Sequence, residues 1–152
     1  MGKIFVLDQE GIESLLSTAL VGRIACCAPD EGEGRPYIVP LAYGYDGEAV
    51  YAFSSPGRKI HIMRKQPLIS FEVDEAEAED RWRSVVAEGA YEELTTEEGL
   101  ALAKRAIFRN DPVPALPEGT IFYRLVLTQK TGRFELPDDE AAIYEAALRA
   151  TA

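Results

Sequence analysis

The short connections between the β-like segments of this sequence constrain its fold more than any other feature. Six segments rich in β-branched and aromatic residues are predicted strands, at residues 23–28, 36–45, 49–53, 69–74, 82–94 and 121–128. A parallel pair needs a crossover of a dozen or more residues, and most of these connections are shorter. The sequence therefore predicts a mainly β protein, an antiparallel barrel or sandwich.

Local signals predict how the strands are joined. Asp46-Gly47 is a hairpin signal, since both residue types tolerate the positive φ angles of a tight turn. We therefore expect residues 36–45 and 49–53 to pair antiparallel. The acidic run at residues 75–80 is expected to be a solvated loop, and Gly89 is expected to mark a bulge or a close backbone approach.

Helices are predicted around the strands. Asp8 can cap a helix whose apolar residues repeat at helical spacing and which ends at residues 20–22. Thr96 opens a second helix, which residues 110–112 end, and residues 138–150 form an alanine-rich terminal helix. These helices are expected to be peripheral to the barrel.

Length and charge limit the class of protein. With 152 residues and 47% hydrophobic content, we expect one domain over residues 1–152, with residues 137–152 as a C-terminal helical tail. The formal net charge is -10. Binding to nucleic acid needs a broad basic face, so no nucleic-acid partner is expected.

Targeting signals and metal-binding patterns are not expected here. The first eight residues lack the apolar run and cleavage site of a signal peptide, and no later segment approaches membrane-spanning length. We expect a soluble, cytoplasmic protein with no membrane partner. Cys26 and Cys27 are adjacent and His61 is the only histidine, so we expect buried cysteines and no metal site.

Four basic residues gather in residues 51–67, YAFSSPGRKIHIMRKQP, which contains no acid. Ser55 can cap a helix there, with Pro56 at its first position. The free amides and the dipole of a helix start favour anions, and Arg58 and Lys59 follow immediately. Arginine can grip two phosphate oxygens while lysine adds a mobile charge. We predict a phosphate site at Arg58 and Lys59.

Other polar residues of this segment have alternative interpretations. Arg64 and Lys65 are interpreted as surface residues that offset the acidic run at residues 75–80. Ser54 is either an ordinary turn hydroxyl or a further phosphate ligand. His61 is interpreted as a helix-surface or interface residue rather than a catalyst.

Two stretches, PYIVPLAYGYDGEAVYAFSSPGRKIHIMRKQPLISFEVD and WRSVVAEGAYEEL, carry a family resemblance. They combine a V-P strand, a D-G turn, a strand ending in serine, an R-K pair opening a helix, and R-S-V in a later strand. Over residues 10–135 the sequence resembles the FMN-binding split β-barrel family related to pyridoxamine 5'-phosphate oxidase, in its nitroimidazole-reductase-like branch. The resemblance implies an antiparallel Greek-key split barrel with peripheral helices.

The resemblance also implies a cofactor site. Arg58 and Lys59 would hold the phosphate of FMN, and Ser54 and Ser55 would lie beside it. Phe53 would lie at the end of the same pocket. Three residues would border the flavin ring: Val39, Pro40 and Leu41.

Partners and activity follow from the same resemblance. The family forms homodimers with the flavin between subunits, so Trp82 and Ser84 would complete the site from the partner chain. Alternatively, Trp82 packs in the core or dimer and Ser84 is an ordinary strand serine. The implied activity passes electrons from NADH or NADPH to a small substrate through the flavin, and requires no catalytic side chain.

Two departures from the family keep alternatives open. Phe53 stands where members of this branch commonly have a histidine, and the C-terminal contacts of pyridoxamine phosphate oxidases are unmatched. A module that binds or stores a flavin or another cofactor without turnover is the alternative function. Deazaflavin and haem are alternative cofactors, haem being the weaker because only His61 offers an imidazole.

Overall fold

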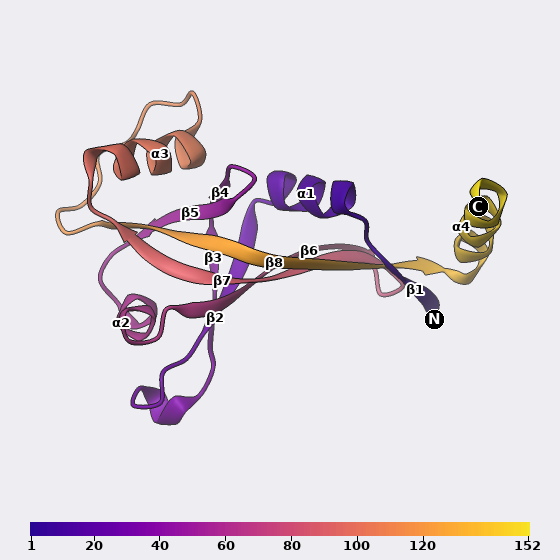
Figure 1. Cartoon of the computed structure of the whole chain (residues 1–152), viewed down its shortest axis with the longest axis horizontal. Coiled ribbons are helices and arrows are strands. Elements are labelled where there is room, and N and C mark those ends of the chain that lie inside the picture. Colours follow the sequence, from indigo (N-terminus) through magenta and orange to yellow (C-terminus); the bar gives the residue numbers. More distant parts are fainter.

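Strands dominate the structure, and they form one antiparallel sheet that curls into a half-barrel (Figure 1). A computed structural model describes residues 1–152. The sheet order is β3-β2-β6-β7-β8-β5-β4, and β1 pairs with β8. This confirms the predicted antiparallel split barrel. The strands are β1 (Gly2–Val6), β2 (Val21–Cys26), β3 (Tyr37–Ala42), β4 (Gly44–Tyr45), β5 (Ala49–Ser54), β6 (Leu68–Ala78), β7 (Arg81–Leu94) and β8 (Ile121–Pro137).

Four α-helices lie around the sheet, as Figure 1 shows. They are α1 (Gln9–Thr18), α2 (Arg58–Lys65), α3 (Glu97–Phe108) and α4 (Asp138–Thr151). Two predicted caps are confirmed: Asp8 Oδ1 accepts from the Gly11 amide at 2.8 Å, and Thr96 Oγ1 accepts from the Gly99 amide at 3.0 Å. None of these helices combines the length and the hydrophobicity that a membrane-spanning helix requires.

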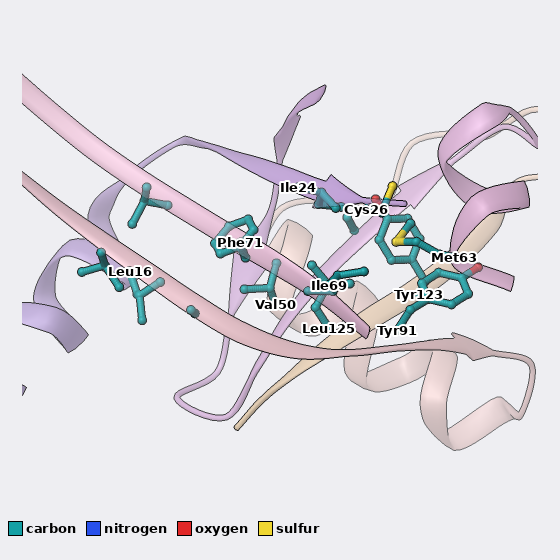
Figure 2. Close-up of a cluster of buried hydrophobic side chains, with 14 of the residues drawn as sticks. Leu16, Ile24, Cys26, Val50, Met63, Ile69, Phe71, Tyr91, Tyr123 and Leu125 are labelled. Atoms are coloured by element: carbon teal, nitrogen blue, oxygen red, sulfur yellow. The ribbon is translucent and has the colours of Figure 1, made fainter. Parts of the chain in front are cut away.

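The core fills the concave side of the sheet. Alternate residues of the strands point inward, so Ile24, Val50 and Leu125 come from three strands and are fully buried. Helix α1 covers one end of this core through Leu16, and α2 covers the other through Met63 (Figure 2). A smaller core, including Tyr51 and Ala103, lies between α3 and the strands β4 and β5. The core thus places α2 firmly at one end of the barrel.

The predicted hairpin at Asp46-Gly47 is only partly correct. Gly44 and Tyr45 pair with β5, but β3 pairs with β2 instead. Tyr43 lies between β3 and β4, where the chain passes from pairing with β2 to pairing with β5. The hydroxyl of Tyr43 donates to the Leu16 carbonyl at 2.6 Å, and its ring packs edge-on against Phe71. These contacts anchor the bend that divides the predicted strand in two.

The sheet is longer than its apolar pattern predicted. Residues 75–78, expected in a loop, extend β6, and β8 continues to Pro137 rather than ending near residue 128. Strand β1 was not predicted at all. Cross-strand ion pairs such as Arg83 with Glu75 support this extension beyond the core, and such pairs leave no apolar alternation to detect.

Gly89 lies at a bulge, as predicted. The register of β7 against β8 shifts between Glu88 and Gly89. A Cβ atom at Gly89 would collide with the carbonyl oxygen of Val126. The backbone of β8 therefore leaves no room for a side chain at this position of β7.

Candidate functional site

Helix α2 begins directly after β5, at the end of the half-barrel. The predicted cap at Ser55 is wrong: Gly57 is the N-cap, the helix starts at Arg58, and no side chain caps it. Residues 55–57 leave β5 in a non-helical path, so the serine is too early to reach the first turn. The opening amides of a helix lack partners within the helix, and here they also lack a capping side chain.

Arg58 and Lys59 carry charges that no carboxylate of the chain neutralises. The guanidinium carbon of Arg58 lies 4.5 Å from the centroid of the Tyr37 ring. Lys59 Nζ donates to Ser54 Oγ at 2.8 Å, and Ser54 in turn donates to the Ser55 carbonyl at 2.7 Å. Two adjacent unpaired cations in a chain of net charge -10 make this a candidate anion site.

The last turn of α2 is neutralised, as expected, but by different acids than predicted. Arg64 forms an ion pair with Glu93. Lys65 Nζ lies 2.7 Å from Glu31 Oε1 and 3.1 Å from Asp30 Oδ2. The acids at residues 75–80 lie in the extension of β6 and in the turn after it, whereas the last turn of α2 faces the loop between β2 and β3 and the end of β7.

His61 is exposed on the surface of α2, which agrees with one of its two interpretations. Its Nε2 lies 3.0 Å from Glu31 Oε1. The only imidazole of the chain therefore contacts a carboxylate of the loop between β2 and β3.

The open edges of the sheet border the same region. Strand β3 is the last strand at one edge, with no partner beyond it. At the other edge β4 pairs with β5 only at Val50 and Tyr51, so Ala52–Ser54 has no partner on that side. The contact between Arg58 and Tyr37 links the end of β5 to the start of β3. The split of the barrel thus opens beside the two unpaired cations.

Three predicted ring-bordering residues lie on β3, at the edge of this split. Val39 and Leu41 are half-buried and alternate with the exposed Pro40. Proline is tolerated on an edge strand, where its missing donor removes no ladder hydrogen bond. The structure therefore brings Val39, Pro40 and Leu41 to the open edge of the sheet, on the strand whose first residue, Tyr37, contacts Arg58.

Phe53 points away from Ser54, because successive side chains of β5 lie on opposite faces. Its ring centroid lies 5.7 Å from that of Phe108 and 5.6 Å from that of Phe122. It therefore packs on the side of the sheet that α3 covers, with 38% of its surface exposed. Its role at a cofactor stays a prediction.

Trp82 and Ser84 lie far from α2 within one chain. Leu94 lies at the end of β7 that is near α2, where it pairs with Phe122. At about 3.3 Å per residue, the strand covers about 40 Å between Trp82 and Leu94. Trp82 Nε1 donates to Glu135 Oε2 at 2.6 Å. A cavity of about 350 Å³ lies beside this tryptophan and is lined by Arg81, Arg83, Glu75 and Phe134 among others.

Two residues near the cations were not predicted as part of the site. Tyr37 lies under Arg58, and Gly32 lies against its guanidinium. Their types alone, a strand tyrosine and a turn glycine, carry no functional signal.

Cys26 is buried nearby, and burial raises the pKa of its thiol while Lys59 and Arg58 oppose that shift. Cys27 is exposed, contrary to expectation, because it lies just beyond the end of β2, the strand that buries Cys26.

The fold and this region define a class: a split-barrel protein with a candidate anion site where a helix starts beside the split. The comparisons with known proteins identify the family. The model of the pyridoxamine 5'-phosphate oxidase family matches residues 8–134, and the chain therefore belongs to that family. The family resemblance seen in the sequence is confirmed.

Solved structures of similar fold come from several bacteria. An FAD-binding protein of Mesorhizobium loti is 35% identical, with a TM-score of 0.73 over 88% of this chain and 99% of that one. An FAD-binding protein of Mycobacterium smegmatis is 24% identical, with a TM-score of 0.69 over 87% and 99% of the two chains. The second likeness, under 25% identity, shows the fold alone.

Two further relatives extend the comparison. A protein of Bacteroides thetaiotaomicron, proposed to confer 5-nitroimidazole resistance, is 21% identical with a TM-score of 0.73, covering 88% of this chain and 89% of that one. An uncharacterized protein of Rhizobium meliloti is 37% identical over 94 residues, or 62% of this chain. The match spans 60% of the length of that curated relative.

Proposed function

We propose that this protein binds a flavin nucleotide, with the flavin phosphate at Arg58 and Lys59. The unpaired charges of these two residues, at the uncapped start of α2, are the observation that carries the proposal. The FAD-binding relative from Mesorhizobium loti supports it, at 35% identity over 88% of this chain. Because the phosphate is common to FMN and FAD, the same cations serve either; FMN is the nucleotide that the sequence predicts.

The residues around the split fit a flavin phosphate. The guanidinium of Arg58 offers a fixed pair of donors, and the Lys59 ammonium supplies a second charge beside it. Ser54 holds the lysine through its hydroxyl, and Ser55 lies next to it in the chain. At the free backbone edge of β3 the Pro40 carbonyl offers a hydrogen-bond acceptor for the polar edge of a flavin ring, whereas the backbone groups of Val39 and Leu41 point toward β2.

A homodimer is part of the proposal, and the convex face of the sheet supports it. The outer face, defined by Val21, Ile38, Leu68 and Val86, carries large apolar side chains, of which Ile38 is 64% and Leu68 69% exposed. Exposed apolar patches on a soluble domain mark interaction surfaces. By strand alternation Trp82 and Ser84 lie on this same face, so a second copy docked there would bring them toward the first copy's split.

The proposed activity is an FMN-dependent oxidoreductase of the cytoplasm, acting on a small substrate with NADH or NADPH as donor. A flavin held at Arg58 and Lys59 would supply the hydride- and electron-transfer chemistry. The chain's own residues bind its phosphate, orient its ring and exclude water, and no side chain is assigned an acid, base or nucleophilic role. Binding without turnover remains the alternative function.

The visible absorption spectrum of the purified protein tests flavin binding, followed by titration with FMN and with FAD. Two flavin bands, or saturable binding of either nucleotide, are expected. A colourless protein that binds neither contradicts the proposal. Reduction of the bound flavin by NADH or NADPH then separates an oxidoreductase from a binding module, and sedimentation of the holoprotein tests the homodimer.

A further inference from the structure

The loop between β2 and β3 lies against the start of α2, and α2 itself holds it there. The Lys65 ammonium contacts both Asp30 and Glu31 of this loop. His61 adds a contact to Glu31 at 3.0 Å. Within the loop, Glu31 forms a backbone bridge with Ala28, and a short 3-10 turn, Gly32–Gly34, follows. Residues near the C-terminal end of α2 thus bind the loop, and the loop extends back to Arg58 in the first turn of the helix.

Gly32 is the point where this loop contacts Arg58. Its φ angle is +56°, a conformation that favours glycine. A Cβ atom built on Gly32 would lie 2.6 Å from Arg58 Nη2, closer than such atoms can approach. On another side, the Tyr37 ring lies 4.5 Å from the guanidinium carbon. The guanidinium therefore packs against both the loop backbone and an aromatic ring.

We infer that Gly32 and the fastened loop position the Arg58 guanidinium for the phosphate of the ligand. This inference rests on the proposed function. It makes Gly32 a positioning residue, since it acts through Arg58, and it gives Lys65 an indirect role in binding. An arginine already confined before binding loses less conformational freedom when it binds, and this saving appears as affinity.

The loop itself provides the control for Gly32. Gly34 also has a positive φ angle, +74°, but a Cβ atom there would meet only Pro29 atoms at ordinary contact distance. Gly32→Ala and Gly34→Ala therefore share the backbone strain and differ in the contact with Arg58. The collision at Gly32 falls on the far end of a flexible side chain, which can move aside, so we expect this variant to fold.

The test measures the dissociation constant for FMN, and for FAD, by quenching of flavin fluorescence in full-length variants. Gly32→Ala is expected to weaken binding about tenfold, which corresponds to about 1.4 kcal/mol. Gly34→Ala is expected to stay within about twofold of the wild type. Equal losses in the two glycine variants would overturn the inference, because strain alone would then explain them.

Lys65→Ala releases the loop without straining its backbone, so it tests the same inference if Gly32→Ala is unstable. We expect an affinity loss of about threefold, about half of a tenfold effect in free energy. Arg64→Ala, which removes a neighbouring charge that does not touch the loop, is its control. Equal affinities of these two variants would contradict the role of the loop.

A double-mutant cycle with Arg58→Ala separates positioning from a direct or structural effect. If Gly32 acts through Arg58, adding Gly32→Ala to Arg58→Ala weakens FMN binding no further. An undiminished tenfold loss in that background would overturn the inference. If the wild type itself binds neither FMN nor FAD, the proposed function fails instead, so the two failures are distinct.

Discussion

The two ends of helix α2 carry the same charges in different surroundings. Arg64 and Lys65, in the last turn, contact Glu93, Asp30 and Glu31. Arg58 and Lys59, in the first turn, have an aromatic ring and a hydroxyl as neighbours. The paired end fastens neighbouring elements to the helix, whereas the unpaired end retains its charge for a ligand. The presence or absence of a carboxylate partner therefore distinguishes structural cations from binding cations better than residue type does.

Removing the unpaired charges tests this comparison with the largest expected effect. Replacing both residues, Arg58→Ala with Lys59→Ala, is expected to weaken FMN binding at least about 100-fold, because each charge-assisted hydrogen bond contributes about 1.5–3 kcal/mol. Fluorescence titration measures the loss.

Arg64→Ala is the matched control for that double variant. It should leave the FMN affinity within about twofold and lower the folding stability only slightly, because an ion pair of an exposed arginine contributes little. If it weakened FMN as much as the double variant did, general electrostatics would replace a defined site, and the comparison between the two ends would fail.

Arg23, on the outer face of the sheet, is a further cation that has carboxylate partners. Arg23 Nη1 lies 3.0 Å from Asp74 and 3.3 Å from Glu72. Burial, together with the neighbouring Asp74, raises the pKa of Glu72 to about 7 from an ordinary 4.5, although Arg23 opposes the shift. Two acids neutralise this cation, so we expect the group to affect stability.

Replacing Glu72 by glutamine should therefore change how stability depends on pH. The folded wild type holds a proton that the unfolded chain releases between about pH 4.5 and 7, so its stability falls as the pH rises through that window. Glu72→Gln removes this fall, and at pH 8 its Tm should be about 2–4 °C higher, the shift for about 1 kcal/mol in a chain of this size. Thermal unfolding at pH 5 to 8 checks this; parallel curves for both proteins would contradict it.

The smallest effect concerns a polar group that has neither a partner nor a solvent contact. The Tyr123 hydroxyl is buried in the core near Met63 of α2 and has no hydrogen-bond partner (Figure 2). Tyr123→Phe removes an unsatisfied group and should stabilise the fold by about 1 kcal/mol without changing FMN affinity. A loss of FMN affinity, measured by the same titration, would show that an unpartnered group inside the closed core also serves the ligand.

Much of the fold was predictable from the sequence because its apolar alternation is local. The core parts of β6 and β7, the caps at Asp8 and Thr96, and the bulge at Gly89 each rest on signals within a few residues. The extension of β6 and β8 rests on cross-strand ion pairs, and β1 rests on pairing with a strand more than 100 residues away. Such pairings leave little mark in a single sequence.

The candidate site was predictable in its charges but not in its surroundings. Arg58 and Lys59 stood out because four basic residues gather without an acid between them. The acids that neutralise Arg64 and Lys65 were not predicted, because only the fold brings Glu93 and the β2–β3 loop to α2. The helix start was misjudged by two residues, since Gly57 rather than Ser55 is the N-cap, and the neighbour Gly32 was not predicted because its contact with Arg58 crosses the barrel split.

The dissociation constants of the wild-type protein for FMN and for riboflavin test the central claim most directly. The two ligands share the flavin ring and differ in the phosphate, so their ratio isolates what Arg58 and Lys59 contribute. We predict that FMN binds at least about 100-fold more tightly than riboflavin, a difference of about 2.7 kcal/mol. Equal affinities would contradict the account, because the unpaired cations would then contribute nothing to recognition of the phosphate.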